Sequence, residues 1–283
     1  MEVKLAKSAG FCFGVKRAVT KLEEEINKNS ETPIYTYGSI IHNASVVKEF
    51  EDKGVKIINS EEEIGKIKGS KLVIRAHGIP EKIYDIARKN NVDVIDATCP
   101  FVAKIQDIAK EKSLEGRTIV IVGDKNHPEV LGIIGWTHGD YFVVKDEKEA
   151  NELPFFDKTP VTVVFQTTFE VQKYKYLVEI ISKKGYDIDV INTICNATAL
   201  RQEEAKNISQ NVDAMIVVGD KSSANSNRLY KICKECLKDT YFIQKPSDLD
   251  VTYLQSCICV GITAGASTPD NIIQEVFLNV RRI

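Results

Sequence analysis

Three cysteines, each placed between an extended apolar stretch and an amphipathic helix, constrain the fold of this chain more than any other feature. Cys12, Cys99 and Cys195 are separated by 87 and 96 residues. The path from Cys195 past the C-terminus and on to Cys12 gives a third arc of about the same length. Three arcs of nearly equal length predict three similar units, each presenting one thiol to a common centre.

Within each arc, apolar strands alternate with amphipathic helices. The strands are expected at Pro33–Gly38, Lys71–Ala76, Val92–Asp96, Thr118–Val122, Val161–Phe165, Tyr186–Ile191, Ala214–Gly219 and Ile258–Ile262. The helices include one from Gly14 to about Asn29, one over Phe101–Ser113, one over Glu170–Lys184 and one that Pro80 opens. This alternation is typical of parallel sheets covered by helices.

The last arc ends in a helix that Pro269 opens, with no strand after it. We infer that the alternating segment Glu2–Lys7 supplies the missing strand and completes the third unit. The sequence therefore predicts an α/β protein of three units with small parallel sheets. Their expected limits are 14–98, 99–194, and 195–283 together with the N-terminal strand 1–13.

Polar side chains follow most of the central strands at the point where each strand ends. They are His42, His77, His127 with Glu129, Gln166–Thr168, Ser223–Asn225 and Gly265–Ser267. Ligands of parallel sheets bind outside the carboxyl ends of the strands. If the units face inward, these side chains and the three cysteines line one cavity.

The three thiols leave alternatives open when they are considered alone. They are either small buried side chains, ligands of a zinc ion, or ligands of an iron–sulfur cluster. Structural zinc takes four ligands that are often paired closely in sequence, whereas these cysteines are distant and unpaired. A cubane cluster held by three thiolates fits better, and its open iron can act as a Lewis acid toward a substrate oxygen.

Two hydroxyl-rich loops precede predicted helices, at Ser222–Asn225 and at Ser267–Pro269. Such helix N-termini favour a phosphate group, although simple helix capping is the alternative. His127 and Glu129 are close enough in sequence to form a proton relay near neutral pH. The pair Cys233 and Cys236, within an amphipathic helix, and the pair Cys257 and Cys259 are interpreted as core residues.

Composition excludes several other classes of protein. A net charge of −2 gives no indication of a nucleic-acid partner or a polybasic membrane surface. No apolar run approaches the roughly 18 residues of a membrane-spanning helix, and no signal peptide is apparent. Seven cysteines without dense spacing are typical of a reducing compartment. We therefore expect a cytoplasmic protein.

Six motifs, in order along nearly the whole chain, make a more specific comparison possible. They are Gly10–Val15, Ala76–Gly78, Asp96–Pro100, His127–Val130, Gln166–Thr168 and Thr263–Ser267. Their combination resembles the 4-hydroxy-3-methylbut-2-enyl diphosphate reductase family, which provides the last enzyme of the methylerythritol phosphate route to isoprenoids.

The resemblance implies a pseudo-threefold trefoil of three α/β units around a central 4Fe-4S cluster. Cys12, Cys99 and Cys195 match the cluster ligands. The positions that match diphosphate ligands are His42, His77, Ser223, Asn225 and Ser267. His127, Glu129 and Thr167 match the residues around the substrate hydroxyl and its proton supply. One departure is Ala224, which stands where the family usually has a second serine.

The activity implied is a reductive dehydroxylation of an allylic diphosphate. Glu129, fed by His127, protonates the departing oxygen, and the products are isopentenyl and dimethylallyl diphosphates. The resemblance also implies a monomer that receives electrons from ferredoxin or flavodoxin. One rival is an aconitase-like hydro-lyase, for which arginines are expected in the strand-end loops. Arg75 is predicted within a strand and Arg228 beyond the loop core. The other rival is a non-catalytic zinc protein.

Overall fold

The structure is a computed structural model that describes residues 1–28, 31–185 and 187–283. The chain divides into two compact bodies. The terminal body comprises Met1–Lys16, His42–Lys48 and Asn196–Ile283, and the central body comprises Arg17–Ile41 and Glu49–Cys195.

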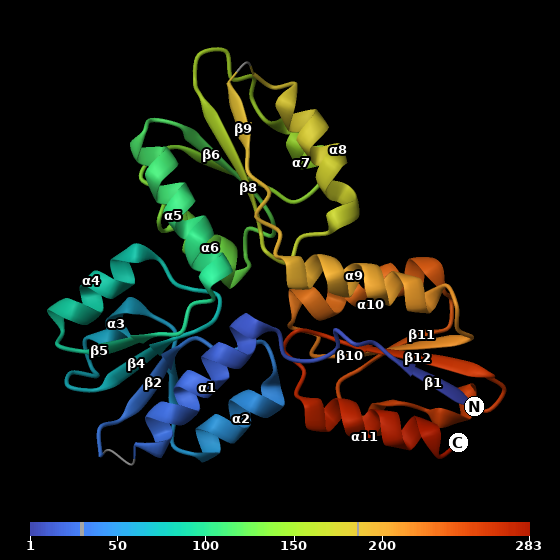
Figure 1. The fold of residues 1–283 in the computed structure, drawn as a ribbon. Helices are drawn as coiled ribbons and strands as arrows, with labels where there is room; N and C mark the ends of the chain where they lie inside the picture. The colour runs from blue at the N-terminus through green and yellow to red at the C-terminus, as the bar shows by residue number, and fades with distance from the viewer. Residues whose placement is uncertain (29–30, 186) are drawn as a thin grey trace. The chain divides into compact units, whose positions relative to one another are not determined.

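The terminal body contains one four-stranded parallel sheet in the order β1-β12-β10-β11. Its strands are β1 (Glu2–Leu5), β10 (Ala214–Val218), β11 (Thr240–Ile243) and β12 (Cys259–Ala264). Helices α9 (Asn196–Ser209) and α10 (Ala224–Cys236) cover one face, and α11 (Asp270–Arg281) covers the other (Figure 1). Two short 3-10 helices, Pro246–Asp248 and Val251–Leu254, precede β12. The N-terminal strand pairs with β12 from Glu2 opposite Cys259 onward, as inferred from the sequence.

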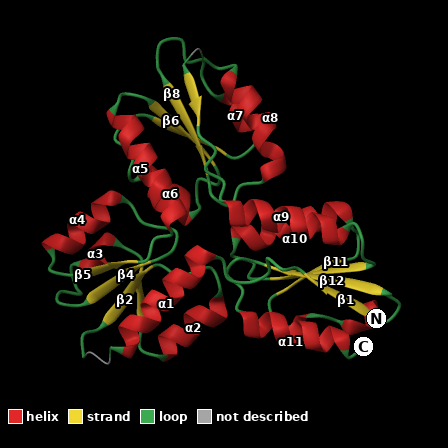
Figure 2. Ribbon diagram, viewed as in Figure 1, coloured by secondary structure: helices red, strands yellow, loops and turns green. Residues whose placement is uncertain are grey.

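The central body contains two further parallel sheets, in the orders β3-β2-β4-β5 and β7-β6-β8-β9. Their strands are β2 (Ile34–Tyr37), β3 (Lys56–Ile58), β4 (Lys71–Ile74), β5 (Asp93–Asp96), β6 (Thr118–Val122), β7 (Tyr141–Val144), β8 (Val161–Phe165) and β9 (Ile188–Val190). Each sheet lies between helices, as Figure 2 shows. The helices that accompany these strands in the chain are α1 (Phe13–Asn27), α2 (Ala44–Asp52), α3 (Glu61–Ile64), α4 (Glu81–Lys89), α5 (Pro100–Leu114), α6 (Pro128–Ile134), α7 (Glu147–Glu152) and α8 (Val171–Ser182).

All three sheets share one strand order, in which the first and third strands in the chain sequence of each unit lie side by side at the centre. The predicted α/β class with three small parallel sheets is therefore confirmed. In each sheet the edge strand beside the first strand, β3, β7 or β11, is absent from the sequence prediction. The limits expected for three units remain a prediction.

Burial on both faces explains why the central strands are almost entirely apolar. Every residue of β6, β8 and β10 is buried. On one face of the β6–β8 pair, Val163 and Phe165 belong to a cluster with Leu177 of α8. On the other face Ile121 belongs to a cluster with Ile105 of α5. Each such side chain contributes about 1.5–3 kcal/mol through its burial.

Some element ends differ from the sequence prediction. The strand expected at Lys71–Ala76 ends at Ile74, so Arg75 lies in the loop beyond it. Pro80 and Pro269 are the residues that precede α4 and α11 and not their first helical residues. Two predicted ends, Asn29 and Tyr186, lie outside the described residues.

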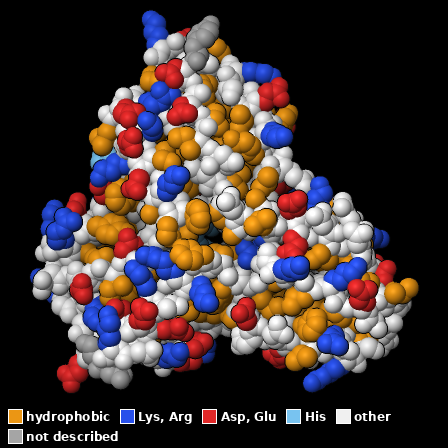
Figure 3. Space-filling model, viewed as in Figure 1, with side chains coloured by type: hydrophobic (Ala, Val, Ile, Leu, Met, Phe, Trp, Pro, Cys, Tyr) orange, Lys and Arg blue, Asp and Glu red, His pale blue; other side chains and the backbone are white. Residues whose placement is uncertain are grey.

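Within the described residues, no helix combines the length and the apolar character that a bilayer crossing requires. Acidic and basic side chains are interspersed on the face shown in Figure 3.

Candidate functional site

Each sheet presents a candidate ligand-binding edge, formed by the loops that follow its first and third strands. After the first strands, glycine amides donate to the last residue of the neighbouring edge strand: Gly38 to Ile58, Gly123 to Val144 and Gly219 to Ile243, each at 2.8 Å. These loops lead to His42, His127 and Ser223. The loops after β4, β8 and β12 carry His77, Thr167 and Ser267. In each sheet the first and third strands are neighbours, and the chain leaves them toward opposite edges of the sheet. The two loops therefore flank a topological switch point, which is where α/β sheets bind ligands.

The three cysteines occupy equivalent positions after the fourth strands, and one backbone hydrogen bond recurs at each. The Cys99 amide donates to the Ala76 carbonyl at 2.9 Å, and that of Cys195 donates to Thr167 at 3.1 Å. The Cys12 amide donates to Ala266 at 3.2 Å. In every case the acceptor lies two residues beyond the end of the third strand. Each thiol is therefore held beside the polar loop of its own sheet.

The surroundings of these thiols suit metal ligation. All three residues are half-buried, and none forms a disulfide within the described part of the chain. Cys99 caps α5, while Cys12 and Cys195 immediately precede α1 and α9. The positive end of a helix dipole stabilises a thiolate, which is the form that binds iron. The donor set therefore fits an iron–sulfur cluster.

Glu129 is a buried carboxyl whose two oxygens are both bound by one residue. Its side chain is 1% exposed. The Thr167 amide donates to Oε1 at 2.6 Å, and the Thr167 hydroxyl donates to Oε2 at 2.7 Å. Burial raises the pKa of Glu129 to about 7, although the two hydrogen bonds from Thr167 oppose the shift. A carboxyl with this pKa can take up or release a proton at neutral pH.

His127 is the N-cap residue of α6. Its Nδ1 accepts a hydrogen bond from the Glu129 backbone N–H at 3.1 Å, whereas the Glu129 carboxyl is bound by Thr167. In the neutral imidazole this leaves the proton on Nε2. The ring packs edge-to-face against His77, with centroids 5.4 Å apart. The central body thus places His77, His127, Glu129 and Thr167 in one chain of contacts.

In the terminal body three of the predicted anion-binding residues, Ser223, Asn225 and Ser267, are buried, whereas His42 is half-buried. Ser223 caps α10 by accepting from the Ser226 amide at 3.3 Å, and the Ser267 hydroxyl donates to the His42 carbonyl at 2.8 Å. Asn225 is 5% exposed, and its Nδ2 has no hydrogen-bond partner among the described residues. A buried amide donor without an acceptor is costly, so this atom suits an oxygen of a bound ligand.

Asp220 is a part of this site that the sequence analysis misses. Its carboxylate accepts from the Ala44 amide at 2.9 Å and from the Ser222 amide and hydroxyl at 2.8 and 2.7 Å. Burial alone would raise the pKa of Asp220, but these hydrogen bonds hold it below its usual range. Asp220 therefore connects the His42 loop to the Ser223 loop. An aspartate two residues before a serine in a turn is the local signal for such a contact.

The remaining cysteines match their predicted role only in part. Cys233 is fully buried, and burial raises the pKa of its thiol to about 12. Cys236, Cys257 and Cys259 are only half-buried, although Cys257 packs against the core cluster of the terminal body. Cys236 is the last residue of α10, Cys259 is the first residue of β12, and Cys257 lies two residues before that strand.

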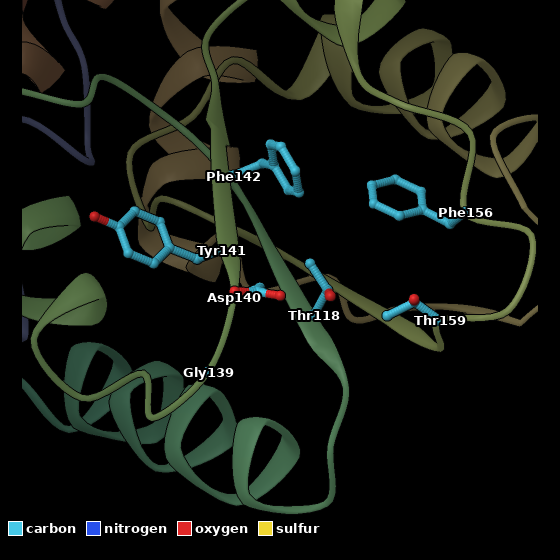
Figure 4. Close-up of a pocket in the computed structure, with 7 residues that line it drawn as sticks. All are labelled: Thr118, Gly139, Asp140, Tyr141, Phe142, Phe156 and Thr159. Atoms are coloured by element: carbon cyan, nitrogen blue, oxygen red, sulfur yellow. The ribbon is translucent and has the colours of Figure 1, made fainter.

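A hollow of about 400 Å³ in the central body lies away from these loops (Figure 4). It includes Thr118 at the start of β6 and Asp140 and Tyr141 at the start of β7. Phe142 and Phe156 pack edge-to-face there, with centroids 5.7 Å apart. Because it lies at the amino ends of the strands, it is not part of the candidate site.

Comparison with known proteins finds relatives over nearly the whole length of the chain. The family model described as LytB protein matches residues 3–281. A protein of Caldanaerobacter subterraneus subsp. tengcongensis named 4-hydroxy-3-methylbut-2-enyl diphosphate reductase is 46% identical over 283 residues, which are 100% of this chain and 98% of that protein. One of Geobacter sulfurreducens with the same name is 44% identical, covering 99% of this chain and 97% of its own.

Two solved structures agree with these relatives. A structure described as (E)-4-hydroxy-3-methyl-but-2-enyl diphosphate reductase, the terminal enzyme of the non-mevalonate pathway, is 41% identical with a TM-score of 0.71 and full coverage of both chains. The E-1-hydroxy-2-methyl-but-2-enyl-4-diphosphate reductase from Plasmodium falciparum is 32% identical with a TM-score of 0.92, covering 99% of this chain and 87% of its own. The chain belongs to the LytB protein family.

Proposed function

We propose that this protein reductively dehydroxylates (E)-4-hydroxy-3-methylbut-2-enyl diphosphate to isopentenyl diphosphate and dimethylallyl diphosphate. Relatives that are 44–46% identical over essentially the whole chain carry the name of this reductase. The observation that carries the proposal is the position of Thr167. Its carbonyl accepts from the amide of Cys195, and its amide and hydroxyl hold the Glu129 carboxyl. One residue therefore links a proposed cluster ligand to a proposed proton donor.

Cys12, Cys99 and Cys195 are the proposed ligands of a 4Fe-4S cluster. The proposal requires the three thiols to meet at one centre, as in the predicted trefoil. When bound, the cluster supplies electrons one at a time and an open coordination position for the substrate. The recurrent cysteine amide hydrogen bonds support this role because they fix each thiol beside a ligand-binding loop.

Glu129 supplies the proton with which the substrate hydroxyl leaves as water. At neutral pH its raised pKa leaves a substantial protonated fraction. Thr167 orients the carboxyl through two hydrogen bonds, and its hydroxyl can pass a proton because it both donates and accepts. We propose that His127 restores the proton, with His77 packed against its ring.

The proposed ligands of the diphosphate in the terminal body are His42, Ser223, Asn225 and Ser267. His77 is a further proposed ligand. Ser223 and Ser267 are small hydroxyl donors, and the Asn225 amide offers a buried donor that awaits an acceptor. Binding at the start of α10 adds the attraction of a helix N-terminus for negative charge. Ala224 lacks the hydroxyl that the family usually offers at its position, so this chain relies more on its neighbours.

The rival function, an aconitase-like hydro-lyase, is less well supported, although one argument against it, that Arg75 lies within a strand, no longer holds. Arg75 lies in a strand-end loop and not within a strand, but its Nε points to the Gly78 carbonyl at 3.5 Å. The side chains proposed to bind the diphosphate are histidine, serine and asparagine, which suit a diphosphate more than several carboxylates. We further propose that the enzyme is a cytoplasmic monomer reduced by ferredoxin or flavodoxin.

The deciding experiment is anaerobic purification followed by turnover of (E)-4-hydroxy-3-methylbut-2-enyl diphosphate with reduced viologen. We expect a brown, iron-containing protein that forms both isomeric products. Cys195→Ser should lose iron and activity, whereas the matched Cys236→Ser should keep both. A colourless zinc protein, or equal iron loss in the two variants, would refute the assignment.

A further inference from the structure

We propose that Arg17 and Arg201 are positioning residues that hold the loops of Cys99 and Cys12, and that their charges raise the reduction potential of the cluster. The electronic part of this inference rests on the proposed function. The positioning part concerns the chain alone.

Arg17 binds the peptide group that enters Cys99. Its Nη1 donates to the Thr98 carbonyl at 2.7 Å. The nitrogen of the same peptide group belongs to Cys99 and donates to Ala76 at 2.9 Å. The peptide is therefore held at both its oxygen and its nitrogen, and rotation of the Cys99 backbone would break at least one of these hydrogen bonds. Lys21, one turn further along α1, donates to the Asp96 carbonyl at 2.7 Å.

Arg201 performs the corresponding task for the loop that leads to Cys12. Its side chain is 4% exposed, and it donates from Nε to the Ser8 carbonyl at 2.9 Å and from Nη2 to the Gly10 carbonyl at 2.8 Å. Glu204, on the same helix, accepts from the amides of Lys7 and Ser8 at 2.8 Å. One helix thus binds both the carbonyls and the amides of a single loop.

The two contacts follow one pattern along the sequence. Arg17 lies five residues after Cys12 and binds the loop of Cys99, while Arg201 lies six residues after Cys195 and binds the loop of Cys12. The helix that starts after one cysteine therefore fixes the approach to another. In the helix after Cys99 the residue five positions on is Lys104, which is exposed. The pattern is thus established for two of the three loops.

The charges of these arginines bear on electron transfer as well as on geometry. A guanidinium remains protonated at all working pH values, and a hydrogen bond to a neutral carbonyl does not cancel its charge. Addition of an electron makes a cluster more negative, so a fixed cation on the ligand loop stabilises the reduced form. Loss of the cation should therefore lower the potential, whereas a lysine at the same place should retain most of it.

The test compares Arg17→Gln and Arg17→Lys with Arg117→Gln, and likewise Arg201→Gln with Arg201→Lys. Arg117 is a matched control because it also binds a backbone carbonyl in the central body, that of Val161 at 2.7 Å, but at the amino end of β8. The readouts are the cluster potential in the loaded full chain, by spectroscopically monitored titration, and amide hydrogen exchange resolved by mass spectrometry.

We expect each glutamine variant to lower the ratio of reduced to oxidised cluster about tenfold at a fixed potential, which is about 59 mV for a one-electron couple. The lysine variants should stay within about threefold of the parent, because their charge is kept. Exchange should accelerate about tenfold in residues 96–99 for Arg17→Gln and in residues 8–12 for Arg201→Gln, as loss of a hydrogen bond implies. Arg117→Gln should change neither quantity.

An unchanged potential in both glutamine variants with a full complement of iron would overturn the electronic part. Unchanged exchange in both loops would overturn the positioning part. If the parent chain assembles no cluster, the proposed function fails, while the exchange measurement still decides the positioning role. Where a glutamine variant does not fold, unchanged loop exchange in the lysine variant overturns the proposal, because a flexible ammonium cannot reproduce the arginine contacts.

Discussion

Substitution of Glu129 by glutamine is the most informative perturbation because it changes the charge of a buried group and little else. Glutamine has nearly the same shape, and its Oε1 can still accept from the Thr167 amide. Its Nε2 can donate to the Thr167 hydroxyl, which then acts as acceptor. We therefore expect a folded protein that binds the cluster and the substrate but lacks the buried acid.

The effect on stability follows from the raised pKa. The ordinary carboxyl pKa is 4.5, and that of folded Glu129 is about 7. Between these values the unfolded chain ionises while the folded chain keeps its proton, so the parent loses stability as pH rises. A difference of about 2.5 pH units at 1.36 kcal/mol per unit gives about 3 kcal/mol, fully lost above pH 7. Glu129→Gln has no such loss.

The assay is urea unfolding of the full-length chain without its cluster, for parent and variant, between about pH 4 and about pH 8. The free energy of unfolding of the variant should gain about 3 kcal/mol relative to the parent over this range. In the loaded enzyme, turnover should fall by at least about 100-fold, the usual contribution of a general acid. Parallel stability curves, or turnover within tenfold of the parent, would refute the reasoning.

Three further substitutions test other contacts of the site. Thr167→Val removes the hydroxyl that donates to Glu129 but keeps the amide that donates to it, so the pKa of Glu129 should rise further. In the plot of turnover against pH, the alkaline limb should then move to higher pH, and turnover should fall about tenfold. Asp220→Asn weakens three hydrogen bonds to a carboxylate of lowered pKa, so the free energy of unfolding in urea should fall by about 1–3 kcal/mol at neutral pH. This loss should disappear as the pH falls through the pKa of Asp220 in the folded protein, and a loss that stays constant with pH would argue against the role of its charge. Ala224→Ser adds a hydroxyl at the start of α10 and should lower KM for the substrate about fivefold, as one hydrogen bond allows; an unchanged KM would show that this position does not contact the diphosphate.

The sequence predicts the central strands well because burial on both faces makes them continuous apolar runs. Thr118–Val122, Val161–Phe165 and Ala214–Val218 are buried at every residue. The missed edge strands have different causes. Tyr141–Val144 and Thr240–Ile243 carry the β-branched and aromatic residues typical of strands and are within reach of a pattern search. Lys56–Ile58 has three residues and one exposed lysine, which is too short for any periodicity.

The site shows a similar division between what is local and what is tertiary. The rule that ligands bind at the carboxyl ends of parallel strands selects His77, His127 and Thr167 from the sequence alone. This rule does not identify Thr167 as the partner of the Glu129 carboxyl, because the two residues are 38 positions apart in the sequence. His127 is close to Glu129 in the sequence, and its ring accepts from the Glu129 backbone amide. Only the packing of β8 beside β6 brings the two together.

The three cysteine loops differ in length, although each delivers its amide to the same kind of acceptor. Two residues separate β5 from Cys99, four separate β9 from Cys195, and six separate β1 from Cys12. Ordering each loop residue costs about 1–2 kcal/mol of backbone entropy, so a longer loop needs more stabilising contacts.

The longest of the three loops has the most contacts of this kind. The shortest loop has the Arg17 contact to the Thr98 carbonyl, with Lys21 on the Asp96 carbonyl two residues earlier. In the four-residue loop, the Thr193 hydroxyl binds both the amide and the carbonyl of Phe165. The six-residue loop has the paired contacts of Arg201 and Glu204 and a glycine, Gly10, at a φ of +95°, where an added Cβ would lie 2.7 Å from the Asp270 carboxylate. In each loop the recurring contact is a hydrogen bond donated by the backbone amide of the cysteine, which does not depend on the neighbouring side chains. The three loops therefore need no common residue beyond the cysteine itself, and each can use different side chains to stabilise the same backbone hydrogen bond.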